Sequence, residues 1–177
     1  MTDLNTATLQ VLAAMQGAPV VSHEHSREAI LLLESDLPWV NLPDGSNIQL
    51  LHVDLNQNLW IVRTRMNRGF GVDTHYHTGP VFAVTLSGEW FYEEYPDKVN
   101  KAGSYLYEPA HSVHSLRVAA DAGEITDVWF AIFGSNVDID EKGDVIRIID
   151  AKGMLTFYRA VCALEGKNCD KLIVIGE

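Results

Sequence analysis

The sequence is poor in cysteine, in basic residues and in long apolar runs. Its 2 cysteines, Cys162 and Cys169, stand in no CxxC or zinc-finger spacing, so a disulfide framework is not expected. Its 13 lysines and arginines against 24 acidic residues give a net charge of −11, which argues against nucleic-acid binding because phosphate contacts need clustered basic side chains. No apolar run approaches the ~20 residues of a membrane span, and no signal-peptide pattern opens the chain. We therefore expect a cytoplasmic protein with no membrane partner.

The 177 residues, 47% of them hydrophobic, suit one globular domain with a sizeable core. From Trp39 onwards, short apolar segments alternate with turn residues, a pattern typical of a β-sandwich or β-barrel. The predicted fold class is all-β, a single barrel or jelly roll with short helices at the two ends. Its strands are predicted at 48–53, 59–66, 81–86, 89–94, 105–107, 115–118, 124–134 and 145–149.

The two ends of the chain read differently from the middle. Residues 3–16 have the apolar spacing of a short amphipathic helix, and residues 153–166 have that of a second one. The tail at 172–175 is apolar enough to dock on the body. We therefore divide the chain into an N-terminal helix and arm at 1–34, a barrel at 35–150, and a C-terminal helix and tail at 151–177.

Three histidines form the candidate metal site. His75 and His77 are two residues apart, so in a strand they point to the same face about 6.6 Å apart. A third ligand has to come from another strand, and His114, which follows a turn at Glu108-Pro109-Ala110, supplies it. We expect the three imidazoles to meet at one ion, although hydrogen-bonded histidines at a barrel mouth would show the same pattern.

Three other histidines compete less well for this role. His23 and His25 form a second His-x-His pair, but their flanks are polar and no later partner matches them. We expect them in a surface or interface segment. His111 has loop-forming neighbours, so we expect it beside the site or exposed rather than on the ion.

These residues resemble the two sequence motifs of the cupin superfamily. The first motif is matched by Gly69, His75, His77 and Gly88, and the second by Gly103, Pro109 and His114. Departures occur at Val81, His111 and Val118, where the motifs usually have Glu, Gly and Asn. The resemblance implies a single RmlC-like cupin domain. Cupins commonly pair through edge strands, so it also implies a homodimer or higher homo-oligomer.

The absence of the usual motif glutamate at Val81 predicts what kind of substrate the metal ion would bind. Three neutral imidazoles leave the full charge on a divalent ion, which favours an anionic, chelating substrate such as an enolate. The set resembles that of the three-histidine iron cupin dioxygenases. Within them, residues 88–116 resemble most the 2,4′-dihydroxyacetophenone dioxygenases, and the resemblance extends over about 39–166. It implies Fe(II) as cofactor, O2 as cosubstrate, and cleavage of an aromatic hydroxyketone to a carboxylic acid and formate.

Two carboxylates are candidate catalytic residues. Glu94 falls on the strand face of Trp90 and Tyr92, near where the resembled dioxygenases bring a carboxylate to the metal or substrate. Glu108 is placed to accept a ligating imidazole's second N–H. Either would help a substrate proton leave, and an exposed glutamate is the alternative for both. Arg63 and Arg65 share a strand face, so they either balance Glu94, hold an anionic substrate, or are simply exposed.

Other functions stay open. The same histidines would hold zinc or nickel in an isomerase, a hydrolase or a sensor of the kind found in cupin anti-sigma domains. A β-diketone satisfies the same chelation, and a metal-free module would bind a small aromatic ligand. The aromatic residues are expected mostly in the core, with some lining the barrel mouth: Trp60, Phe82, Trp90, Tyr92, Tyr105, Tyr107, Trp129 and Phe133.

Overall fold

The computed structural model describes residues 28–123 and 125–177, and Leu32–Glu177 form one compact unit. The predicted helix at 3–16 and the pair His23 and His25 lie outside the described residues. Within the described part of the chain, no helix has the length and apolar character needed to cross a membrane.

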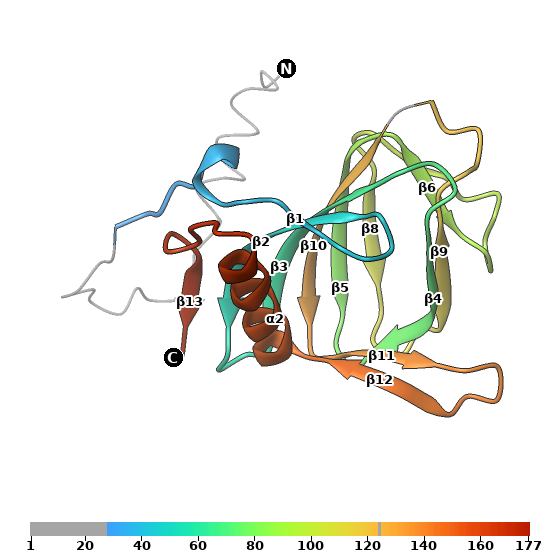
Figure 1. Cartoon of the computed structure of the whole chain (residues 1–177). Helices are drawn as coiled ribbons and strands as arrows, with labels where there is room; N and C mark the ends of the chain where they lie inside the picture. The colour runs from blue at the N-terminus through green and yellow to red at the C-terminus, as the bar shows by residue number, and fades with distance from the viewer. Residues whose placement is uncertain (1–27, 124) are drawn as a thin grey trace, which may run out of the picture. The chain divides into compact units, whose positions relative to one another are not determined.

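The unit is a sandwich of two mostly antiparallel sheets (Figure 1). The larger, seven-stranded sheet has the order β1-β2-β3-β10-β5-β8, and β13 adds to β2 in parallel. Its strands are β1 (Val40–Asn41), β2 (Asn47–Asp54), β3 (Leu59–Met66), β10 (Thr126–Phe133), β5 (Val81–Ser87), β8 (Tyr105–Glu108) and β13 (Ile173–Ile175). The smaller, six-stranded sheet has the order β12-β11-β4-β9-β6-β7. Its strands are β12 (Val145–Ile149), β11 (Asn136–Ile139), β4 (Gly71–His77), β9 (His114–Arg117), β6 (Glu89–Tyr92) and β7 (Asn100–Lys101).

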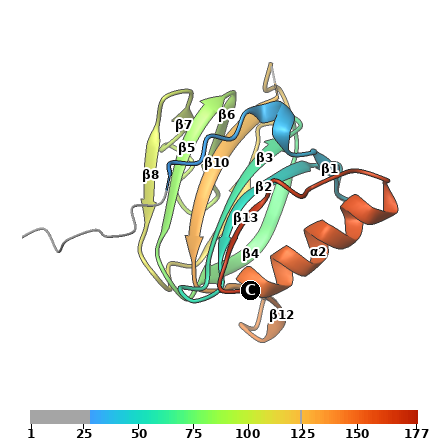
Figure 2. The same cartoon turned by 90° about the vertical axis from the view of Figure 1, so that its left-hand side faces the viewer.

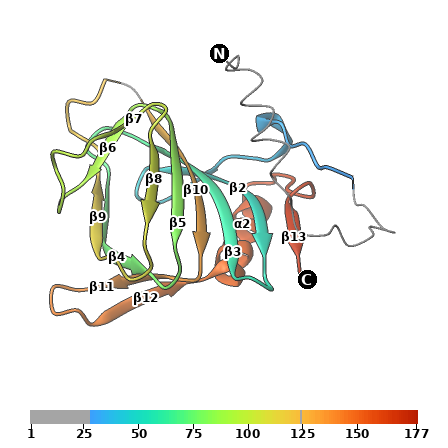
Figure 3. The same cartoon turned by 180° about the vertical axis from the view of Figure 1, so that it is seen from behind.

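This architecture confirms the predicted all-β jelly roll, although the two sheets face each other as a sandwich and do not close into a continuous barrel. Seen from behind, β8, β5, β10 and β3 run side by side in that order (Figure 3). Each predicted strand has a counterpart, but the one at 89–94 was predicted too long. β6 ends at Tyr92 because the chain turns there, with the Tyr95 N–H donating to the Tyr92 carbonyl.

The predicted C-terminal helix is confirmed as α2 (Ala151–Leu164), two residues earlier than expected. Asp150 caps it, because its side chain accepts a hydrogen bond from the Gly153 N–H at 2.7 Å. Leu155, Tyr158 and Cys162 face inward and join the apolar cluster beside β2 and β3. The helix therefore packs along the β2 side of the large sheet (Figure 2). The tail is also confirmed to dock, as β13.

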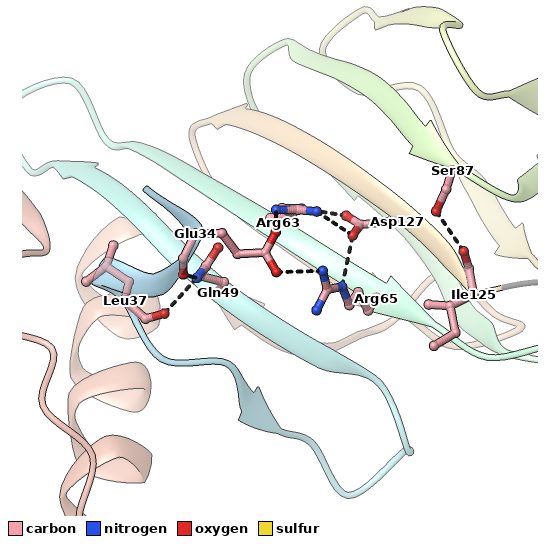
Figure 4. Close-up of polar contacts among 8 residues, drawn as sticks. All are labelled: Glu34, Leu37, Gln49, Arg63, Arg65, Ser87, Ile125 and Asp127. Atoms are coloured by element: carbon pink, nitrogen blue, oxygen red, sulfur yellow. Dashed lines mark hydrogen bonds and ion pairs between the residues drawn. The ribbon is translucent and has the colours of Figure 1, made fainter. Parts of the chain in front are cut away.

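An ion-pair cluster lies on the face of β3 that points away from the interior (Figure 4). Arg63 and Arg65 both donate to the buried Asp127 at 2.7–2.9 Å, and both reach Glu34 of η1 (Glu34–Asp36). Their guanidinium groups also lie over the Trp39 ring, 5.3 and 4.0 Å from its centroid. The expectation that they balance Glu94 or hold a substrate is wrong. Their partners are Asp127 and Glu34, so the cluster fastens η1 to the large sheet.

Candidate metal centre

The three predicted histidines meet on the inner face of the small sheet. His75 and His77 occupy alternate positions at the end of β4, and His114 begins β9 directly opposite His75. One ring nitrogen of each lies within 4.8 Å of the others, and all three side chains are buried. Ring centroids are 4.7 to 5.9 Å apart. The structure thus brings together the three imidazoles that the sequence singled out.

Two of the histidines, His75 and His77, are neutral at neutral pH and so carry a lone pair for a cation. Burial lowers the pKa of His75 and lowers that of His77 to about 4. The His75 Nδ1 lies 2.7 Å from the Asp73 carbonyl, which only accepts, so Nδ1 carries the proton. That bond leaves the His75 Nε2 lone pair free.

Glu108, the last residue of β8, lies beside the histidines. Only 4% of the residue is exposed, and its Oε2 is 3.3 Å from the His114 Nε2 and 3.6 Å from the His77 Nε2. The Tyr92 hydroxyl donates to the other oxygen, Oε1. The three histidines form the predicted donor set, and a carboxylate that the motif position Val81 does not supply lies next to them, on a different strand.

The protonation states of Glu108 and Tyr92 are complementary. Burial raises the pKa of Tyr92 well above its usual value, and the nearby Glu108 adds to this, so the phenol keeps its proton. Burial also opposes charge on Glu108, but His114, His77 and the Tyr92 hydroxyl outweigh it and lower its pKa. At neutral pH, a phenol therefore donates to a carboxylate next to the imidazoles.

Glu94 occupies a different place from Glu108. It follows the end of β6, is exposed, and accepts hydrogen bonds from the Ser115 N–H at 3.0 Å and the Ser115 hydroxyl at 3.2 Å. It is not among the residues that line the cavity described below. These hydrogen bonds join Glu94 to β9 one residue beyond His114, so Glu94 stabilises the strand that carries this histidine.

His111 lies in the loop before β9, as expected, and is exposed. It adopts a positive φ of 67°, and its backbone N–H donates to the His77 carbonyl at 2.8 Å. Its ring lies 5.8 Å from that of Tyr76, on the opposite side of β4 from His75 and His77. His111 thus contributes through its backbone, by holding the end of β4.

Unsatisfied polar atoms converge at the centre. Within the described chain, the His77 Nδ1, the His114 Nε2 and the Glu108 Oε2 are buried without a hydrogen-bond partner. A buried polar atom left unpaired costs about 1–3 kcal/mol, so the His114 Nε2 and the Glu108 Oε2, 3.3 Å apart, call for a bound group. Nitrogen and carboxylate donors in this number suit Fe(II), Zn(II) or Ni(II). The residues present fit a metal ion.

The centre opens into a cavity of about 600 Å³ between the sheets and α2. Its lining includes His75, His77, Tyr92 and Glu108, and otherwise consists mainly of apolar side chains such as Trp60, Val62, Met66, Phe70, Phe130 and Met154. Of the predicted aromatic residues, Trp60 and Tyr92 line the cavity, whereas Tyr105 and Tyr107 are exposed rather than core. Phe70 and Phe130 were not foreseen at the cavity, because the face of each depends on the strand register.

A polar row that the sequence reasoning missed continues from the histidines to the cavity edge. Asp138 of β11 is the cross-strand partner of His75, and Arg147 of β12 is the partner of Asp138. The buried Asp138 carboxylate accepts from the Asn136 amide at 2.6 Å and from the Arg147 Nε at 2.6 Å. Among the described lining residues, Arg147 is the one lysine or arginine.

The chain is similar to a known protein family and to several solved structures. A family model, the ChrR cupin-like domain, matches residues 26–130. No curated protein matches the chain. A protein of unknown function with a cupin-like fold from Ralstonia eutropha JMP134 is 28% identical over 85% of this chain and 93% of that one, with a TM-score of 0.77.

Two more distant structures show the shared fold alone. An acetylacetone dioxygenase from Acinetobacter johnsonii is 18% identical, covers 82% of this chain and 99% of its own, and has a TM-score of 0.67. The anti-sigma ChrR, solved with SigE from Rhodobacter sphaeroides, is 16% identical over 72% of this chain and 75% of that chain, with a TM-score of 0.50. The narrower resemblance to 2,4′-dihydroxyacetophenone dioxygenases stays a prediction.

Proposed function

The chain belongs to the family of ChrR cupin-like domains. We propose that it is an Fe(II)-dependent dioxygenase that cleaves a carbon–carbon bond of an enolisable hydroxyketone. The metal ligands would be His75, His77 and His114. One observation carries the proposal: three buried imidazoles converge beside an apolar cavity, and two of them, His75 and His77, line it.

Ferrous iron at this centre would supply the open coordination positions and the electron that O2 needs in order to react with an enolate. With 2,4′-dihydroxyacetophenone as substrate, one molecule of the ketone and one of O2 would give one molecule of 4-hydroxybenzoic acid and one of formic acid, which balances without a further reductant. The bond that breaks joins the carbonyl carbon to the hydroxymethyl carbon, and each product gains one oxygen atom.

The side chains around the centre match such a substrate. The cavity volume falls in the range of small-molecule sites, and its apolar walls would bind an aromatic ring and exclude water. The unpartnered Glu108 Oε2 is placed to accept the proton that the hydroxyketone loses, while Tyr92 holds the other carboxylate oxygen in position. With Glu108 ionised, a divalent ion leaves a net charge of about +1, which a monoanionic enolate would neutralise.

The proposal is tested by reconstituting the apoprotein with Fe(II) without oxygen and then screening ketones in an oxygen electrode. We expect oxygen uptake with aromatic α-hydroxyketones or β-diketones, and none with ketones that lack an enolisable position. Zinc-loaded protein is the matched control and should consume no oxygen. Iron-loaded protein that consumes no oxygen with any enolisable ketone would contradict the proposal.

A metal-dependent sensor is a second candidate, because the family model and the structural likeness to an anti-sigma protein both favour it. In a sensor, the same histidines would hold zinc for a structural purpose. Tightly held zinc, together with no oxygen uptake by the iron-loaded protein, would support this function over the first. A homodimer or larger homo-oligomer stays a prediction for either function.

A further inference from the structure

Val81 and Glu108 are direct cross-strand partners on β5 and β8. Side chains in such a pair lie on the same face of the sheet, with Cβ atoms about 4.5–5.5 Å apart. Both residues are buried, and both face the interior that holds the histidines. The first cupin motif usually has its glutamate at the position of Val81, so here a glutamate occurs one strand over, at the same level of the sheet.

The distances from Glu108 to the histidines suit ligands of one ion. The two contacts, 3.3 Å to the His114 Nε2 and 3.6 Å to the His77 Nε2, are longer than N–H···O hydrogen bonds, which span about 2.7–3.2 Å. Two ligand atoms bound at about 2.1 Å in octahedral or tetrahedral angles lie about 3.0–3.4 Å apart, a range that includes the distance to His114, while the distance to His77 is slightly longer. Oε2 and the His114 Nε2 also have no hydrogen-bond partner within the described chain.

Tyr92 fixes the orientation of the carboxylate. Its hydroxyl donates a hydrogen bond to the Glu108 Oε1, and the Glu108 Oε2 then points toward the imidazoles. Its ring also packs on the His114 ring, with centroids 4.1 Å apart. One residue of β6 thus positions both the carboxylate from β8 and the imidazole from β9.

We propose that Glu108 is a fourth metal ligand, which supplies from β8 the carboxylate that is missing at position 81 of β5, and that Tyr92 is its positioning residue. This inference deepens the proposed function and rests on it only for the presence of an ion at the histidines. When substrate enters, the same Oε2 would be the proton acceptor.

The test uses Co(II), without substrate or oxygen, in the full chain. Affinity is measured by competition with a chelator, and the ligand set by the visible absorption spectrum of the bound ion. We expect Glu108→Gln to lower affinity at least about tenfold and to change the spectrum, and Tyr92→Phe to cause a smaller loss. The matched control is Glu93→Gln, which removes an exposed carboxylate that pairs with Arg117 and should change neither readout.

A double variant exchanges the two positions. Val81→Glu with Glu108→Val keeps the composition and returns the carboxylate to β5, so it should bind Co(II) more tightly than Glu108→Val alone. An affinity no better than that of Glu108→Val would contradict the equivalence of the two positions. Unchanged affinity and an unchanged spectrum in Glu108→Gln would overturn the inference. Because neither readout involves oxygen, failure of the dioxygenase proposal would leave them unaffected.

Discussion

His75 and Asp138 lie directly opposite each other on β4 and β11. A buried carboxylate is therefore the cross-strand neighbour of this metal-site histidine. Asp138 in turn holds Asn136 and Arg147 at the cavity edge. Replacing Asp138 by Ala would leave both without their partner. We expect the free energy of unfolding, measured in urea, to fall by about 1–3 kcal/mol. Asp144→Ala, an exposed turn position, should stay within about 0.5 kcal/mol, and equal effects would contradict this role.

The ion-pair cluster on the outer face of β3 predicts that Asp127→Ala lowers the free energy of unfolding more than Glu34→Ala does. Asp127 is buried and holds both Arg63 and Arg65, so Asp127→Ala leaves two guanidinium groups without their buried partner. We expect a loss of about 3 kcal/mol in the free energy of unfolding. The Glu34 side chain is 51% exposed, and Glu34→Ala should cost less than about 1 kcal/mol. Similar losses from both variants in urea titrations would be inconsistent with this arrangement.

Cys162 predicts a stability change at high pH. Burial raises the pKa of its thiol from 9.0 to about 11, and the neighbouring Cys169 adds to this. The folded protein therefore keeps the proton that the unfolded chain releases, so this contribution is complete below pH 9 and is lost as the pH rises through about 11. We expect the unfolding free energy to fall with pH in this range. In Cys162→Ala the fall should be shallower, and an identical pH slope would show that the thiol contributes nothing.

Gly79, two residues beyond His77, has no room for a side chain. A Cβ there would lie 2.5 Å from the Phe133 carbonyl oxygen and 2.8 Å from its carbon, which are backbone atoms that cannot rotate away. We expect Gly79→Ala to destabilise the fold by about 1–3 kcal/mol and to weaken metal binding, because the end of β4 has to shift. Gly123→Ala meets no atom of the described residues within 4 Å and serves as the control. Thermal unfolding and chelator competition measure the two effects.

The sequence was sufficient for features that depend on local pattern. Strand alternation placed His75 and His77 on one face, and the motif spacing added His114. The strands at 59–66 and 145–149 have the bounds predicted for them. Their apolar and β-branched residues favour extended structure, and turn residues flank them.

Features that depend on strand pairing could not be predicted. Glu108 was predicted next to a ligating imidazole, but its position across from Val81 depends on the pairing of β8 with β5, and no local pattern fixes that register. Asp138 was missed because β11 has only four residues, too few to show alternation. Glu94 was placed on a strand because the apolar alternation continues up to Tyr92, whereas the turn that ends β6 is set by a backbone hydrogen bond.

The most direct test of oxygen-dependent cleavage supplies 18O2 to the Fe(II)-loaded protein with 2,4′-dihydroxyacetophenone, or with whichever hydroxyketone the oxygen electrode identifies, and analyses the products by mass spectrometry. Insertion of both oxygen atoms across one carbon–carbon bond predicts one 18O atom in the carboxylic acid and one in formate. His114→Ala, which removes a ligand, should give neither product. Products that carry no 18O, or unchanged turnover in His114→Ala, would contradict oxygen-dependent cleavage at this centre.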